Sequence, residues 1–289
     1  MSETLGPWAR WVAAARPRTL PAAAVPVVVG AAASGGGVEW VNSALAAVVA
    51  LALQIATNFA NDYADGVRGT DAQRVGPFRL TASGLVPARR VHTAAGVAFG
   101  VAAVAGLVLS ARTSWVLVAL GATAIAAGYL YTGGPRPYGY LGLGEVFVLA
   151  YFGFLATVGT AYVQHRSIAS AAWWLGLVTG AMACALLEAN NLRDVSSDRA
   201  AGKWTLAARL GRRGGGWLFV AWVLAAFAGL AAAHLWWVGA VALLVYAPAV
   251  RLALSAQEGR ALLPLLRLSA RSQLVVGACA VIALRVTLP

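Results

Sequence analysis

The sequence predicts an all-α protein that crosses a membrane several times. Hydrophobic residues make up 60% of its 289 residues and charged residues only 11%, a composition typical of integral membrane proteins. The apolar runs have the ~20 residues that a helix needs to span the hydrocarbon core. Ala, Leu, Gly and Val dominate these runs, and none shows the alternating pattern of a membrane β-strand.

Nine such runs divide the chain, and we expect them to form nine transmembrane helices around a central cavity. They cover about residues 20–36, 41–60, 91–110, 114–132, 143–163, 171–190, 215–233, 235–254 and 272–288. The abundant Gly and Ala residues allow close helix packing in lipid. Because no long linker separates the runs, residues 1–289 are expected to form a single transmembrane domain.

Basic residues gather on one side of this topology. All but three of the 22 Lys and Arg residues lie at the N-terminus or in the turns after the second, fourth, sixth and eighth runs. The exceptions are Arg112, Arg166 and Arg285. The positive-inside rule therefore places the N-terminus and both long polar loops in the cytoplasm, at the cell membrane. Topology and anionic membrane lipid explain the net charge of +12, so no nucleic acid is expected as a partner.

Five of the ten acidic residues lie in two short clusters, each after an apolar run. The first cluster reads Asn58-Phe-Ala-Asn61-Asp62-Tyr-Ala-Asp65 and is followed by Asp71. The second reads Asn190-Asn191-Leu-Arg193-Asp194-Val-Ser-Ser-Asp198. Carboxylates in so apolar a chain are costly and usually functional. Helical spacing would place the oxygens of each cluster in a column along one helix face.

These oxygen columns predict a magnesium site. Carboxylate and amide oxygens without Cys or His suit Mg²⁺ or Mn²⁺ rather than zinc, and Mg²⁺ usually combines one or two carboxylates with water and substrate phosphates. The candidate metal ligands are Asn61, Asp62, Asp65, Asp71, Asp194 and Asp198. Among them, the candidate catalytic residues are Asp65, Asp194 and Asp198. The alternative is that each acid pairs with a neighbouring arginine, such as Arg193 beside Asp194.

Basic and amide side chains around the two clusters predict a diphosphate site. Metal ions together with Arg and Lys stabilise the negative charge on a departing diphosphate. The candidate residues are Asn58, Arg74, Arg79, Asn190 and Lys203. The positive-inside rule explains each arginine equally well, whereas Lys203 is the chain's only lysine. The glycine-rich segment after Asp65 is either a lid over the site or an ordinary surface loop.

A third polar turn lies on the same side and reads Tyr129-Leu-Tyr131-Thr-Gly-Gly-Pro-Arg136-Pro-Tyr138-Gly-Tyr140. Four tyrosines around one arginine are suited to binding an aromatic acid. We therefore expect Tyr131, Arg136 and Tyr138 to bind an aromatic substrate, with Arg136 pairing its carboxylate. Anchoring of the aromatic rings at the membrane interface is the alternative.

The two clusters resemble the paired motifs of a known superfamily. The first is similar to the Asn-x-x-Asn-Asp-x-x-Asp signature of the UbiA superfamily of intramembrane prenyltransferases, and the second to its Asp-x-x-x-Asp motif. The strings Asn-Asp-Tyr-x-Asp, Tyr-Thr-Gly-Gly-Pro, Gly-Leu-Gly-Glu and Asn-Asn-x-Arg-Asp-x-x-x-Asp resemble the branch that prenylates 1,4-dihydroxy-2-naphthoate in menaquinone synthesis. The resemblance covers nearly the whole chain. Asp71 departs from it, because it stands farther from Asp65 than in the commoner superfamily pattern.

The resemblance implies an enzyme that transfers a polyprenyl group from polyprenyl diphosphate to 1,4-dihydroxy-2-naphthoate. It implies Mg²⁺ as the cofactor, an isoprenoid tail lying between helices, loss of diphosphate and carbon dioxide, and demethylmenaquinone as the product. Other acceptors, such as 4-hydroxybenzoate or homogentisate, stay open within the superfamily. The sequence does not fix the prenyl chain length or the oligomeric state.

Two other classes fit less well. A CDP-alcohol phosphotransferase is disfavoured because Asp65-Gly66 lacks the rest of that signature. A transporter is disfavoured because its site would lie near the middle of the membrane, whereas these acids lie at the ends of the apolar runs.

Overall fold

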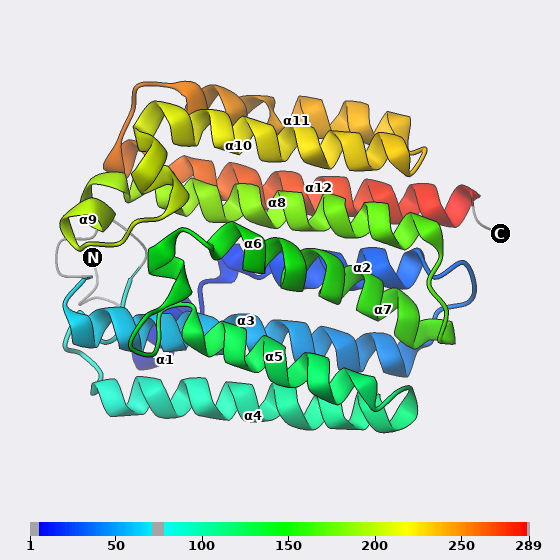
Figure 1. Ribbon diagram of the computed structural model, residues 1–289, viewed down its shortest axis with the longest axis horizontal. Helices are drawn as coiled ribbons and strands as arrows, with labels where there is room; N and C mark the ends of the chain where they lie inside the picture. Colours follow the sequence, from blue (N-terminus) through cyan, green and yellow to red (C-terminus); the bar gives the residue numbers. More distant parts are fainter. Residues whose placement is uncertain (1–5, 71–77, 288–289) are drawn as a thin grey trace.

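The long helices run side by side and turn at the two ends of the molecule (Figure 1). The computed structural model describes residues 6–70 and 78–287. Six of the long helices are α3 (Trp40–Arg68), α4 (Ala88–Arg112), α8 (Ser170–Arg193), α10 (Leu206–Ala232), α11 (Trp236–Leu254) and α12 (Leu263–Thr287). A seventh long helical unit is built from α6 (Gly144–Val148), the π-helix Leu149–Leu155 and α7 (Ala156–His165).

Shorter helices complete the described part of the chain. They are α1 (Pro7–Ala14), α2 (Pro21–Ala32), α5 (Val116–Leu130) and α9 (Val195–Ala200), with 3₁₀ turns at Pro17–Thr19, Tyr138–Leu141 and Gly259–Leu262. Pro occupies the first turn of α1 and α2, where its fixed φ suits a helix start and its missing N–H costs nothing.

The predicted all-α, multi-pass architecture is confirmed, but the count of nine membrane helices is not. Within the described residues, seven helices are long and apolar enough to cross a membrane. The predicted runs 20–36 and 114–132 form the shorter helices α2 and α5, of 12 and 15 residues. The first is short because the chain turns at Ser34 and the glycines after it, and the second because it gives way to the turn that starts at Tyr131.

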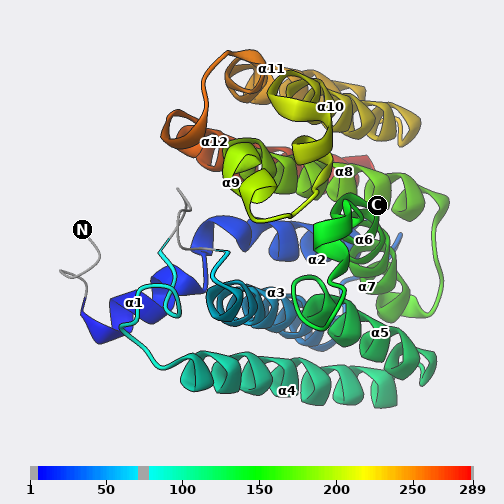
Figure 2. The same ribbon diagram turned by 60° about the vertical axis from the view of Figure 1, so that its left-hand side comes forward.

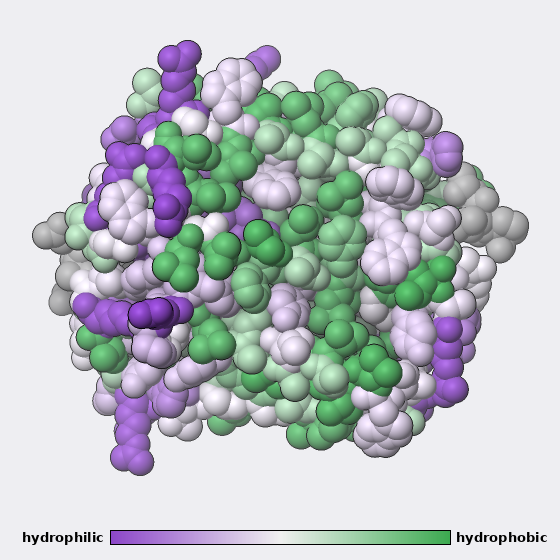
Figure 3. Space-filling view, in the orientation of Figure 1, coloured by the Kyte–Doolittle hydropathy of each residue, from purple (hydrophilic) through white to green (hydrophobic). Residues whose placement is uncertain are grey.

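On the face shown in Figure 3, hydrophobic residues form a belt across the middle of the molecule, and hydrophilic residues concentrate at one end. We call that end the motif end; it comprises residues 61–70, 78–87, 131–143 and 194–205. Large apolar side chains on the belt are exposed, among them Val97, Val101 and Leu244. Apolar surface of this extent suits contact with lipid.

The helices form successive layers across the bundle (Figures 1 and 2). Helices α10 and α11 lie at one edge, α8 and α12 come next, then α2 with the α6–α7 unit, and α3, α4 and α5 form the opposite edge. Glycines allow the closest approach between layers. A Cβ added to Gly153 of the π-helix would lie only 2.7 Å from the Cα of Gly180 on α8.

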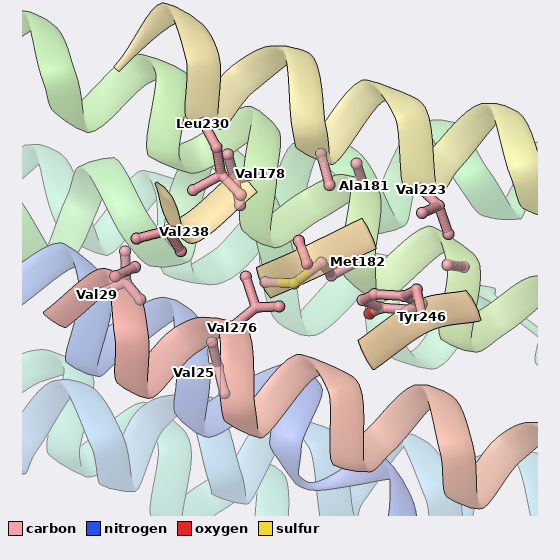
Figure 4. Packing of buried hydrophobic residues seen from close by; sticks show 14 of the residues in the cluster. Val25, Val29, Val178, Ala181, Met182, Val223, Leu230, Val238, Tyr246 and Val276 are labelled. Carbon is pink, nitrogen blue, oxygen red and sulfur yellow. The ribbon is translucent and has the colours of Figure 1, made fainter. Parts of the chain in front are cut away.

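The largest buried cluster fills the half of the bundle that contains α10, α11 and α12. Met182 of α8, Tyr246 of α11 and Val276 of α12 meet in it, with Val25 of α2 at its border (Figure 4). This half is packed with apolar side chains. The other half, from α2 to α8, contains a cavity instead.

Candidate active site

A cavity of about 280 Å³ extends between α2, α3, α4, α5, the α6–α7 unit and α8. Most of its wall is apolar, with side chains such as Leu53, Leu109, Leu155 and Val163. The wall is polar at the motif end, where it includes Asn58, Asn61, Asp65, Arg79, Asn190, Asn191 and Lys203. This division fits a substrate with a long apolar tail and a charged head.

Asp65 lies at the polar end of the cavity and connects two loops. Helix α3 continues to Arg68, so the first acid cluster is helical as expected. The Oδ1 atom of Asp65 accepts a hydrogen bond of 2.8 Å from the Tyr140 hydroxyl, and its Oδ2 lies 3.4 Å from the Arg79 guanidinium. The carboxylate therefore joins the loop after α3 to the tyrosine-rich turn.

Asp62, a predicted metal ligand, holds a loop in the structure. Its Oδ2 accepts the Leu80 N–H at 2.8 Å and its Oδ1 accepts the Thr81 N–H at 2.9 Å. The residue is 1% exposed and is not among those that line the cavity. Charge-assisted bonds to two successive backbone amides fix the segment that carries Arg79.

The two amide side chains of the first cluster, Asn58 and Asn61, also form hydrogen bonds to neighbouring side chains. Asn58 donates to the Thr19 hydroxyl at 3.1 Å and accepts from Gln54 at 3.3 Å, so it ties α3 to the N-terminal segment. The Oδ1 atom of Asn61 accepts the Thr132 hydroxyl at 2.6 Å. This leaves the NH₂ group of Asn61 for the cavity, and an amide NH₂ donates to phosphate oxygens rather than to a metal.

The second acid cluster does not form one helical column. Helix α8 ends at Arg193, Asp194 adopts φ −100° and ψ 8°, and α9 begins at Val195. Arg193 forms a bidentate pair with Asp194, with both N–O distances at 2.7 Å. The same guanidinium donates to Asn190 Oδ1 at 3.1 Å. Asp194 thus matches the arginine-pairing alternative, and its partner also engages the predicted diphosphate ligand Asn190.

Asp198 and Lys203 complete the polar end. The Lys203 Nζ lies 3.8 Å from Asp198 Oδ1 and 5.6 Å from the centroid of the Tyr140 ring, over its face. A cation over a tyrosine face is attracted by the ring quadrupole. Since Tyr140 also donates to Asp65, this one side chain links two acid clusters that are far apart in the sequence.

Tyr131 and Tyr138, which we predicted to bind an aromatic substrate, both line the cavity. Their ring centroids lie 5.4 Å apart in an edge-to-face arrangement, and Tyr138 stacks on Phe147 at 3.9 Å. Burial, followed by the charge of Glu145, raises the pKa of Tyr131. Burial is also the main cause that raises the pKa of Tyr138. Both phenols therefore stay neutral at physiological pH.

Arg136 does not reach the cavity. It is exposed and is not among the lining residues, whereas Arg16 and Arg79 are. Arg16 has a φ of 55°, a left-handed conformation that is costly for a residue with a side chain. The sequence indicated Arg16 only as one of the basic residues that set the membrane topology. It did not predict that Arg16 lines the cavity. The predicted ligands Asp71 and Arg74 lie outside the described residues.

The donor set at the polar end fits a hard divalent cation. Asp65 lines the cavity and lies 3.4 Å from the Arg79 guanidinium, and the Asp198 carboxylate lies 3.8 Å from Lys203, another lining residue. Neither Cys nor His belongs to this set. The described residues contain no group of three or more His, Cys, Asp or Glu side chains that could hold a metal. Phosphate oxygens and water would therefore have to complete the shell, as is usual for Mg²⁺.

Residues 23–261 match the UbiA prenyltransferase family. The chain is also 49% identical over 210 residues to the protein named 1,4-dihydroxy-2-naphthoate octaprenyltransferase in Mycobacterium tuberculosis, covering 71% of this chain and 70% of that protein. The chain belongs to the UbiA prenyltransferase family. The superfamily expected from the two acid clusters is thereby confirmed.

Further relatives of this UbiA family member carry related names. The Escherichia coli protein named 1,4-dihydroxy-2-naphthoate octaprenyltransferase is 38% identical over 210 residues, covering 70% of this chain and 68% of that protein. The Synechocystis protein named 2-carboxy-1,4-naphthoquinone phytyltransferase is 31% identical over 209 residues, covering 70% of this chain and 66% of that protein.

Solved structures share the fold of this UbiA family member. A UbiA homolog from Aeropyrum pernix superposes with a TM-score of 0.67 at 17% identity, over 91% of this chain and 97% of that one. A UbiA homolog from Archaeoglobus fulgidus bound to GPP and Mg²⁺ superposes with a TM-score of 0.66 at 12% identity, over 94% of this chain and 99% of that one.

We predict that Tyr140→Phe lowers kcat/KM for prenyl transfer about tenfold or more, because it removes the hydrogen bond to the charged Asp65 but keeps the ring beneath Lys203. Tyr140→Leu should cost more, since it removes both interactions. Burial, and after it the charge of Asp65, raises the pKa of Tyr140 to about 12. Loss of the Tyr140 proton should therefore not reduce activity between pH 7 and about 10.

The matched control is Tyr129→Phe, which removes a hydroxyl from an exposed tyrosine of the same turn and should leave the rate unchanged. Wild-type activity in Tyr140→Phe would show that the link between the two clusters has no part in turnover.

Proposed function

We propose that this protein transfers a polyprenyl group from polyprenyl diphosphate to 1,4-dihydroxy-2-naphthoate, with release of diphosphate and carbon dioxide, in menaquinone synthesis. The observation that carries the proposal is the cavity, which joins an apolar chamber to a polar end where both acid clusters meet at Tyr140. The names of the mycobacterial and Escherichia coli relatives support the naphthoate as the acceptor.

The prenyl donor would bind along the whole cavity. Its tail would occupy the apolar chamber between Leu53, Leu109 and Leu155. Its diphosphate would receive hydrogen bonds and positive charge from Lys203 and Asn61. Asp65 and Asp198 would hold Mg²⁺, which when bound supplies positive charge that stabilises the departing diphosphate.

The reaction follows from this arrangement. The allylic carbon–oxygen bond breaks, and its electron pair leaves with the diphosphate. The faces of Tyr131 and Tyr138 stabilise the allylic cation, while the apolar wall keeps water from trapping it. The ring carbon that bears the carboxylate attacks the cation. The carbon–carbon bond to the carboxylate then breaks, carbon dioxide leaves, and the released electron pair restores the aromatic ring. The product is demethylmenaquinone in its hydroquinone form.

The motif end would face the cytoplasm at the cell membrane. Arg112, Arg166 and Arg285 support this orientation, because they lie at the opposite end, where Arg166 donates to the backbone of Arg112 and Arg285 to that of Gly36. The other basic residues that the structure describes follow the segments that the positive-inside rule assigns to the cytoplasm.

Purified membranes containing the protein should transfer a labelled prenyl group to 1,4-dihydroxy-2-naphthoate in preference to 4-hydroxybenzoate, with carbon dioxide released in equal amount.

Asp65→Asn and Asp198→Asn should each lower kcat at least a hundredfold, because each removes a carboxylate from the polar end. The control Glu258→Gln changes an exposed acid that does not line the cavity and should be neutral. Preference for 4-hydroxybenzoate would refute the acceptor, and absence of transfer to any aromatic acid would refute the activity.

We also propose that Arg16, rather than Arg136, pairs the carboxylate of the acceptor, because Arg16 lines the cavity and Arg136 is exposed. Arg16→Gln should raise the KM for the aromatic acid about tenfold, the cost of one charge-assisted contact. Arg136→Gln should leave that KM unchanged. Steady-state kinetics with each substrate varied in turn will decide, and the reverse result would return the role to Arg136.

A further inference from the structure

Glu145 and Asn191 form a buried contact behind the cavity wall. Glu145 of α6 is 2% exposed and Asn191 of α8 is 5% exposed. The Nδ2 atom of Asn191 donates to Glu145 Oε1 at 3.2 Å. Asn191 lines the cavity, whereas Glu145 is not among the lining residues. The carboxylate therefore reaches the cavity only through the amide that it holds.

This contact determines which end of the Asn191 amide a ligand meets. An amide has an NH₂ donor at one end and a carbonyl acceptor at the other. Because Glu145 holds the NH₂ group, the carbonyl oxygen is the end left for the cavity. No group in the described residues donates to this oxygen. Its ligand must supply either a hydrogen or a cation, and an ionised diphosphate by itself supplies neither.

The polar end of the cavity that contains Asn191 adjoins the ring of Tyr131. Leu187, one turn before Asn191 on α8, and Tyr131 both pack on Gly144, the residue before Glu145. A Cβ at Gly144 would lie 3.2 Å from Leu187 and 3.4 Å from the Tyr131 ring. Asn191 and Tyr131 thus border the same cavity, on either side of Gly144 and Glu145.

Helix α8 fixes Glu145 in place on the far side of the amide. The Cys184 thiol donates to the Glu145 backbone carbonyl at 3.3 Å. The carboxyl group of Glu188, which is fully buried, lies beside that of Glu145. Cys184 and Asn191 lie on one face of α8, and this face bonds both the backbone and the side chain of Glu145.

We propose that the Asn191 carbonyl oxygen accepts a hydrogen bond from a ring hydroxyl of the aromatic acceptor, and that Glu145 is the positioning residue that orients this amide. The inference rests on the proposed function, because it names how that acceptor is recognised. It assigns a role to a carboxylate placed inside an apolar helix, where an ionisable group is expensive. It also makes a hydroxyl group a requirement for the acceptor.

Steady-state kinetics of the full-length protein will test the positioning role. Asn191→Leu and Glu145→Leu should each raise the KM for 1,4-dihydroxy-2-naphthoate about tenfold and leave the KM for the prenyl diphosphate unchanged. Glu145→Gln keeps an acceptor oxygen for the Asn191 NH₂ group, so it should restore the acceptor KM to within about twofold of wild type. The unchanged donor KM serves as the control for folding.

Direct binding will test the hydrogen bond itself. Quenching of tryptophan fluorescence by the acceptor, without any prenyl donor, reports affinity apart from turnover. The two monomethyl ethers of 1,4-dihydroxy-2-naphthoate each lack one donor hydrogen. One of them should bind wild type about tenfold more weakly than the parent compound and should bind Asn191→Leu with no further loss.

Three results would overturn the proposal. Glu145→Gln could be as defective as Glu145→Leu, which would make the carboxylate charge, not its acceptor oxygen, the requirement. Asn191→Leu could weaken both substrates equally. Relative to the parent compound, each methyl ether could lose as much affinity for Asn191→Leu as it does for wild type. Failure of the proposed function would look different, because wild-type protein itself would then neither bind nor prenylate the naphthoate.

Discussion

Carboxylates at the end of an apolar cavity must be hydrogen-bonded or paired, and this requirement organises the motif end. An unpaired buried charge costs several kcal/mol, roughly the whole margin of stability of a domain. Asp62 meets the requirement with two backbone N–H groups, and Asp194 does so with both arms of Arg193. Asp65 and Asp198 have longer contacts to Arg79 and Lys203. Asp62 and Asp194 are thus engaged in shaping the site, and we propose that Asp65 and Asp198 bind the cation of the substrate complex.

One half of the bundle is filled with packed side chains, and the other half contains the cavity of the candidate site. Side chains from α8, α10, α11 and α12 fill one half, and α8 also forms a wall of the cavity in the other. Close glycine contacts, such as Gly153 with Gly180, hold the π-helix against α8. The amide of Asn191 is therefore held on a closely packed helix, which suits a site that must orient a reactive cation.

The sequence predicted the residue types of this site better than their individual roles. Apolar runs and the helical spacing of the first cluster correctly placed Asp65 on a membrane helix, and the motifs correctly indicated the UbiA family. The break in the second cluster was missed because Asp194 leaves the helix to pair with Arg193, and spacing alone cannot show that. The sequence did not distinguish Tyr140 from the other three tyrosines of its turn, because its contacts with Asp65 and Lys203 join segments that are far apart in the chain. Which end of an Asn amide faces the cavity depends on partners from distant segments, such as Thr132 for Asn61 and Glu145 for Asn191.

A structure of the protein with Mn²⁺ and an unreactive prenyl thiodiphosphate would test the central claim most directly. Anomalous scattering would locate the metal, and density for the ligand would locate its head and tail. Our account predicts Mn²⁺ between Asp65 and Asp198, the diphosphate in contact with Lys203, and the prenyl tail in the apolar chamber beside Leu53 and Leu155. A metal held by Asp62 and Asp194 instead, or a tail bound outside the cavity on the lipid-facing surface, would contradict it.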